Sequence, residues 1–99
     1  MASLLEKQNK FVGMVAQLIQ FAQAKGYWLS FGDAWAKAGH KDGSFHYRRL
    51  AIDLNLFKDG VFLNRTEDHL PLGTYWKSLG GTWGGDFKNK DGNHYSWGE

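Results

Sequence analysis

Two histidines of this chain each have an aspartate a short distance away in the sequence. His46 precedes Asp53 by seven positions, and Asp91 precedes His94 by three. Neutral imidazole and carboxylate both suit zinc, and two imidazoles with one carboxylate leave a fourth position of the ion open for water. Asp91 need not bind the metal, and could instead accept a proton from that water. The four residues therefore predict a hydrolytic zinc site.

The spacing alone also allows a second interpretation. Four histidines and ten acidic residues in 99 positions produce such spacings by chance, so hydrogen-bonded surface residues remain the alternative. His40, in a glycine-rich loop, and His69, in the first turn of a helix, are expected to be solvated. Asp86 competes with Asp91 for the role of base, but only Asp91 lies three residues before His94.

The strand that would carry Asp53 is predicted from a clean alternation over residues 49–57. The leucines and Ile52 fall on one face, while Asp53 and Arg49 fall on the other. Because the step from His46 to Asp53 is odd, a continuous strand would place the two on opposite faces. His46 must therefore come from an irregular segment before the strand, and His94 lies where a loop becomes the last strand.

Other elements follow from periodicity and from turn residues. Apolar residues at three- and four-residue steps predict a helix over 3–25, which Ser3 and Glu6 cap and Gly26 ends. The further expected elements, in chain order, are a strand in 27–35, a polar loop over 36–44, a turn at 58–60, a return strand at 61–63, a helix over about 71–79 that residues 66–68 cap, and a strand at 93–97. This order predicts an α+β fold with a small antiparallel sheet and flanking helices.

Composition limits the class of protein. Hydrophobic residues make up 42% and charged residues 22%, which is typical of one small globular domain spanning residues 1–99. The net charge of +2 comes from scattered basic residues, so we expect no nucleic-acid partner. The chain has no cysteine, which excludes thiolate ligands. Of 16% aromatic residues, those near the C-terminus are expected to be mostly core, with one or two in a substrate groove: Trp76, Trp83, Tyr95 and Trp97.

Two separated motifs resemble a known enzyme family. Ser44-x-His46 with Ala51-x-Asp53, and the later Asp91-x-x-His94, are similar to the zinc D-alanyl-D-alanine carboxypeptidase and L-alanyl-D-glutamate peptidase family. This family includes phage endolysins and shares its fold with the hedgehog signalling domain. The stretches 49–57, 80–87 and 92–97 look most like small phage and prophage members, and the resemblance spans residues 11–99.

The resemblance implies a role for each residue of the site. His46, Asp53 and His94 would bind Zn²⁺, and Asp91 would be the catalytic base. The implied reaction is hydrolysis of a peptide bond in the peptidoglycan stem, through an activated water and a polarised carbonyl. The bond would be of the L-alanyl-D-glutamate or the D-Ala-D-Ala type, and the biological role would be phage lysis.

The chain departs from the family pattern at the cationic positions. Arg49 stands where family members commonly carry glycine, and Ala36 and Lys37 stand where relatives often have an arginine that could stabilise an oxyanion or a substrate carboxylate. The candidates for this contact are Lys37, Ser44, Arg48 and Arg49. Lys37 would supply a point charge but no bidentate fork, so the alternative function is a non-catalytic zinc-containing module that binds the cell wall or has a structural role.

The remaining expectations concern where the protein acts and with what. Peptidoglycan is the expected partner, and a monomer is the expected state. No apolar run reaches membrane-spanning length, so no stable membrane insertion is expected. Residues 1–7 lack the layout of a signal peptide. We therefore expect synthesis in a host cytoplasm and action on the cell wall or in the periplasm after release.

Overall fold

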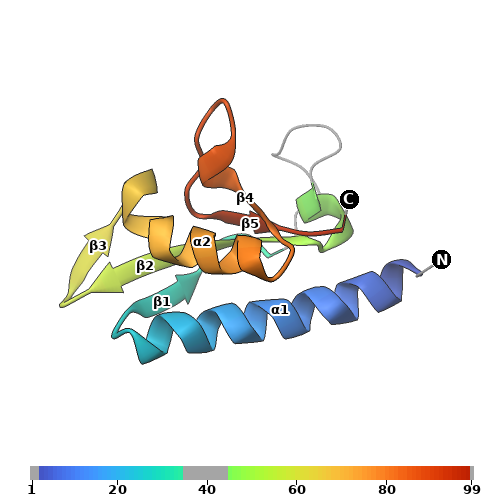
Figure 1. Cartoon of the computed structure of the whole chain (residues 1–99), viewed down its shortest axis with the longest axis horizontal. Helices are drawn as coiled ribbons and strands as arrows, with labels where there is room; N and C mark the ends of the chain where they lie inside the picture. Colours follow the sequence, from blue (N-terminus) through green and yellow to red (C-terminus); the bar gives the residue numbers. More distant parts are fainter. Residues whose placement is uncertain (1–2, 35–44, 99) are drawn as a thin grey trace.

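Strand β2 (Ala51–Lys58) is the centre of the sheet in this computed structural model, which describes residues 3–34 and 45–98. β1 (Trp28–Phe31) pairs with one edge of β2, and β5 (His94–Ser96) and β3 (Val61–Leu63) pair with the other edge. β4 (Thr82–Trp83) extends the sheet beyond β5. All of these pairs are antiparallel, which confirms the predicted α+β class (Figure 1).

One face of the sheet packs against both helices. The alternate residues Ile52, Leu54 and Leu56 of β2 are buried together with residues of α1 (Leu4–Ala24) and α2 (Leu70–Ser78). Successive strand residues point to opposite faces, so Asp53 and Asn55 lie on the other face, where their side chains are only partly buried. The core contains these buried residues: Phe11, Met14, Leu18, Ala22, Leu50, Ile52, Leu54, Leu56, Leu72, Trp76, Trp83 and Tyr95.

The ends of α1 confirm the sequence prediction. The Ser3 hydroxyl accepts a hydrogen bond from the Glu6 backbone N–H at 3.1 Å, and the Glu6 carboxylate accepts one from the Ser3 N–H at 3.3 Å. This reciprocal pair satisfies two of the N–H groups that a helix start leaves free. The helix ends before Gly26, which has a positive φ of 88°.

The predicted hairpin between β2 and β3 is also present. Asp59 and Gly60 both have positive φ, 53° and 79°. Two central residues of this kind form the mirror-image turn whose twist matches that of paired strands. The hairpin places β3 beside the C-terminal half of β2.

The structure differs from the sequence prediction in several boundaries. β2 begins at Ala51, because a 3-10 helix, η1 (Phe45–Arg48), precedes it and Arg49 has a positive φ of 59°. Arg49 therefore lies outside the strand, and the argument that it shares a face with Asp53 is wrong.

Three short elements were not predicted: β4 and the 3-10 helices η2 (Thr66–His69) and η3 (Gly84–Asp86). The residues predicted to cap α2 form η2, and α2 itself starts at Leu70. The predicted loop over 36–44 lies outside the described residues. Within the described ranges, neither helix has the length and apolarity needed to span a bilayer.

Candidate metal centre

His46, Asp53 and His94 form one cluster. His46 Nε2 lies 3.2 Å from Asp53 Oδ1, and His94 Nδ1 lies 3.5 Å from the same oxygen. One ligand atom from each residue lies within 4.8 Å of the other two. The cluster therefore brings together three of the four residues that the sequence singled out.

The donor atoms of this cluster fit a zinc ion. Zinc bonds of 2.0–2.2 Å place the ligand atoms of a tetrahedral site about 3.3–3.6 Å apart, which is close to the 3.2 and 3.5 Å distances to Asp53 Oδ1. This oxygen is buried and accepts no hydrogen bond from the described residues, although two ring nitrogens are close. A buried carboxylate oxygen without such a partner is costly, and a cation shared with both imidazoles would satisfy it. The cluster can therefore bind a metal ion.

The backbone holds Asp53 from both sides. On one side Gly32 donates a hydrogen bond to the Asp53 carbonyl at 2.8 Å, and the Asp53 N–H donates to the Asp33 carbonyl at 2.7 Å. On the other side Asp53 is in register with His94. A Cβ at Gly32 would lie 3.1 Å from the Asp53 Cβ, so the absence of a side chain there lets β1 come close to the ligand.

The two histidines reach Asp53 from different elements. His46 comes from η1, the irregular segment before β2, as the odd spacing requires, and it is only 2% exposed. His94 is the first residue of β5 and is 9% exposed. Their rings meet edge to face with centroids 5.1 Å apart, and Phe87 packs on the His94 ring at 5.5 Å. The ligand side chains are therefore held by packing as well as by the backbone.

The segment that carries Asp91 and His94 is fixed by Gly84. The Gly84 carbonyl accepts a hydrogen bond from the Asp91 N–H at 2.9 Å, and the His94 N–H donates to the Asp91 carbonyl at 3.1 Å. The Trp83 indole N–H, in the core, donates to the Gly92 carbonyl at 2.7 Å. These bonds tie the Asp91–His94 segment to β4 and η3, and no spacing rule in the sequence pointed to Gly84 or Trp83 as its supports.

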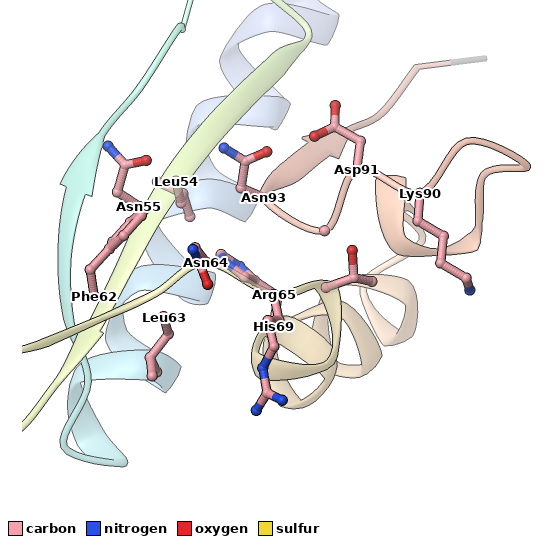
Figure 2. Close-up of a pocket in the computed structure, with 12 residues that line it drawn as sticks. Leu54, Asn55, Phe62, Leu63, Asn64, Arg65, His69, Lys90, Asp91 and Asn93 are labelled. Carbon is pink, nitrogen blue, oxygen red and sulfur yellow. The ribbon is translucent and has the colours of Figure 1, made fainter.

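Asp91 lies at the rim of a pocket next to the cluster. The pocket has a volume of about 210 Å³ and includes Leu54 and Asn93, the chain neighbours of Asp53 and His94. Figure 2 shows Asp91 at one side of the pocket, Asn55 at the opposite side and Asn93 between them. The Asp91 side chain is exposed, so it is available to a molecule that enters beside the metal cluster.

His69 differs from its prediction. It is 3% exposed rather than solvated, it lines the same pocket, and its Nδ1 lies 2.8 Å from the Tyr95 hydroxyl. Burial lowers the pKa of His69, against the smaller opposing effects of Asp68 and of a hydrogen bond with the Leu63 backbone. Burial also raises the pKa of the Tyr95 phenol. Both side chains therefore favour their neutral forms, and their contact links η2 to β5.

The other candidates that belong to the described residues do not join the cluster. Asp86 is exposed and forms an ion pair with Lys77 at 2.9 Å. The side chains of Arg48 and Arg49 are exposed. Lys37, Ser44 and His40 lie outside the described residues.

The aromatic residues near the C-terminus are mostly core, as predicted. Trp76 and Tyr95 are fully buried and Trp83 is 3% exposed, while Trp97 packs partly buried against the core. The Trp76 indole N–H donates to the Ser96 carbonyl at 2.9 Å. The buried rings therefore belong to the core and do not line a groove.

The fold and the cluster define a small α+β domain with a His–Asp–His cluster, able to hold a metal ion, on the sheet face opposite the helices. The D-alanyl-D-alanine carboxypeptidase family matches residues 37–97. The chain belongs to this family, which confirms the resemblance found in the sequence. Comparison with curated proteins gives no match.

A solved structure supports the same fold. The crystal structure of the Serratia marcescens L-Ala D-Glu endopeptidase ChiX is similar with a TM-score of 0.69, over 91% of this chain and 79% of that one. The two sequences are 16% identical, so this likeness concerns the fold alone.

Proposed function

We propose that this single domain is a zinc-dependent peptidase that hydrolyses a peptide bond in the stem of peptidoglycan. The observation that carries the proposal is the cluster itself, in which two imidazole nitrogens lie 3.2 and 3.5 Å from one buried carboxylate oxygen. Membership of the D-alanyl-D-alanine carboxypeptidase family supports peptidoglycan as the substrate.

The proposed ligands are His46, Asp53 and His94. A bound zinc ion would supply a Lewis acid and make a water molecule acidic near neutral pH. Since two of its three ligands are neutral, the ion would keep a net positive charge. The burial of both histidines supports this role, because it removes competing water from the donor atoms.

Asp91 is the proposed general base. Its carboxylate is exposed at the rim of the pocket, and its backbone is bonded to both Gly84 and His94. It would accept the proton of the attacking water and transfer it to the leaving amine. The substrate peptide would lie along the open face, with a side chain or carboxylate in the pocket.

Digestion of purified peptidoglycan by the zinc-loaded protein tests the proposal. We expect soluble fragments that a chelator abolishes, and their masses identify the bond that is cut. The family description names a D-alanyl-D-alanine bond and the similar structure is of an L-Ala D-Glu endopeptidase, so these are the two bonds to distinguish. Phage lysis as the biological role would be tested by expressing the protein with a pathway to the periplasm and measuring lysis of the host.

Two matched variants separate catalysis from metal binding. Asp91→Asn should retain zinc and lose turnover by about 10²-fold or more, while Asp86→Asn, an exposed acid of the same segment paired with Lys77, should retain both. His46→Ala should lose zinc and cleavage together. An Asp91→Asn protein with full turnover would refute the role of Asp91, and a zinc-bound wild-type protein that cuts no stem peptide would identify a non-catalytic module.

A further inference from the structure

Three aromatic residues occupy neighbouring register positions on the sheet face that carries the metal cluster. Trp28 is in register with Phe57, and Phe57 is in register with Phe62 on its other side. Cross-strand partners project to the same face and pack together, and the Phe57 and Phe62 ring centroids are 5.3 Å apart. We call Trp28, Phe57 and Phe62 the aromatic platform.

The aromatic platform shares its face with the metal cluster. Asp53, Asn55 and Phe57 alternate along β2 and are all partly buried, whereas the residues between them are fully buried. Asn55 donates a hydrogen bond to the Ser30 hydroxyl of β1 at 3.2 Å, so a polar strip separates the platform from the cluster. In Figure 2, Phe62 and Asn55 lie at one side of the pocket and Asp91 lies at the other.

The rings of the platform are exposed to solvent, because the helices pack on the other face of the sheet. Trp28 is 77% exposed and Phe62 is 52% exposed. The helices pack on the opposite face of β2, against its leucines. The platform rings therefore contribute little to the described core, and an exposed cluster of aromatic rings next to a candidate active site is typical of a binding surface.

The chemistry of the face favours a sugar as the occupant. A pyranose ring stacks its C–H face on an aromatic ring, while its hydroxyl and acetamido groups need hydrogen-bond partners, which Asn55 and Ser30 present beside the platform. A second copy of this chain is a poorer fit. Fully exposed, three such rings would offer at most about 450–750 Å², and two of them are partly covered, whereas a stable dimer buries about 800 Å² on each partner.

The distance from the cluster to the platform is longer than the connection between the stem peptide and the sugar that carries it. Asp53 and Phe57 are four residues apart on one strand, which is about 13 Å. In peptidoglycan a lactyl group joins the first alanine of the stem to the sugar, and these two units span about 7 Å when extended. With the scissile bond at the cluster, the platform would therefore lie about 6 Å beyond the sugar that carries the stem, where a neighbouring ring of the same glycan strand can reach it.

We infer that the aromatic platform binds a sugar ring of the peptidoglycan glycan strand and aligns the attached stem peptide with the metal cluster. The inference rests on the proposed function, since it takes peptidoglycan as the substrate. It assigns binding to Trp28 and Phe62, and it gives them no part in the chemistry.

Binding without turnover tests the inference. The wild-type protein, Trp28→Ala and Phe62→Ala are mixed with purified peptidoglycan sacculi in the presence of a chelator, and the bound fraction is measured by sedimentation. We expect each variant to bind about tenfold more weakly than the wild type. Phe31→Ala is the matched control, because Phe31 is 66% exposed on the same strand but alternates to the opposite face from Trp28, and its binding should be unchanged.

A soluble probe separates the glycan from the peptide. An N-acetylglucosamine–N-acetylmuramic acid tetrasaccharide without stem peptides is titrated into the wild-type protein, and we expect the indole N–H resonance of Trp28 to shift. Two results would overturn the inference. One is wild-type binding by both variants and no shift at Trp28. The other is a wild-type dimer that either substitution converts to a monomer.

The outcome of this test is independent of the proposed catalysis. Binding of sacculi that depends on Trp28, with no cleavage when zinc is present, would refute the proposed peptidase and leave the platform supported. Cleavage of sacculi that is unaffected by Trp28→Ala and Phe62→Ala would support the proposed peptidase and refute the platform.

Discussion

Replacing Gly84 by alanine should disable the metal centre without unfolding the protein. Gly84 is buried at the start of η3, and its carbonyl accepts hydrogen bonds from the N–H groups of Phe87 and Asp91, at 3.1 and 2.9 Å. A Cβ at this position would overlap the Asp91 carbonyl oxygen and would lie 2.8 Å from the Cβ of His94. The new methyl group would therefore push directly on both the proposed base and a proposed ligand.

The size of the effect follows from these distances. Carbon atoms pack at about 3.5–4.0 Å, so the backbone near His94 must move by roughly 1 Å to admit the methyl group. Overpacking of this kind costs about 1–3 kcal/mol of unfolding free energy. A zinc ligand tolerates only about 0.2 Å from its ideal distance, and a 1 Å error in a catalytic geometry costs about 10²-fold in rate.

The control is Gly81→Ala, which overpacks the core against Trp76 rather than against Asp91 and His94. A Cβ at Gly81 would overlap the indole nitrogen of Trp76, whose N–H donates to the carbonyls of Thr82 and Ser96. We expect both variants to lose stability, and only Gly84→Ala to lose zinc affinity and cleavage by about 10²-fold. Urea unfolding, zinc titration and the peptidoglycan digest measure the three quantities at a temperature where both variants are folded.

One result would refute this reasoning. If Gly84→Ala bound zinc and cut peptidoglycan like the wild type, while it lost as much stability as Gly81→Ala, the Asp91–His94 segment would tolerate displacement. The inference that the Asp91–His94 segment holds the site rigidly would then be wrong.

Three further predictions concern stability. Zinc at about 100 times its dissociation constant should increase the free energy of unfolding by about 2.7 kcal/mol, which raises Tm by about 10 °C or more in a domain of this size. A chelator should reverse this rise in Tm. An unchanged Tm would contradict the proposed metal site at Asp53. Because burial lowers the pKa of His69 below its ordinary 6.5, the unfolded chain binds the proton more readily, so the unfolding free energy should fall as the pH drops below 6.5, by up to about 1.4 kcal/mol per pH unit. His69→Gln should remove this part of the dependence of the unfolding free energy on pH, which urea titrations at several pH values measure. The same pH dependence in both proteins would contradict the prediction for His69. Ser3→Ala should cost about 1 kcal/mol through loss of the cap with Glu6, and an unchanged urea midpoint would show that the first turn of α1 does not contribute.

Local patterns in the sequence were enough to predict most of the fold. The cap of α1 at Ser3, the alternation along β2 and the turn at Asp59 and Gly60 each depend on neighbouring residues, and each is confirmed. The start of β2 was misplaced because alternation continues through Arg49, although that residue adopts a positive φ. A hydrophobic pattern records which side chains alternate, but it does not register a backbone turn that keeps the same alternation.

The candidate site was only partly accessible to the same reasoning. The odd step from His46 to Asp53 correctly required an irregular segment, which is η1. The burial of His69 was missed because its partner, Tyr95, is 26 residues away, and no local pattern reports such a pair. The support of Asp91 by Gly84 was missed for a similar reason. A sequence does not distinguish a glycine required by a turn from a glycine required by the close approach of another segment.

The two faces of β2 divide the tasks of this domain. Leu54 and Leu56 on one face join the core with the helices, so substitutions there should act mainly through stability. The other face carries Asp53, Asn55 and Phe57, which lie outside the core, so substitutions there should change stability little. These residues connect the metal cluster to the aromatic platform along one strand. Since a shift of one residue in the register of β2 would exchange the two faces, the burial of the leucines also fixes the position of the ligand. The stability of the core and the geometry of the proposed site are therefore set by the same alternation.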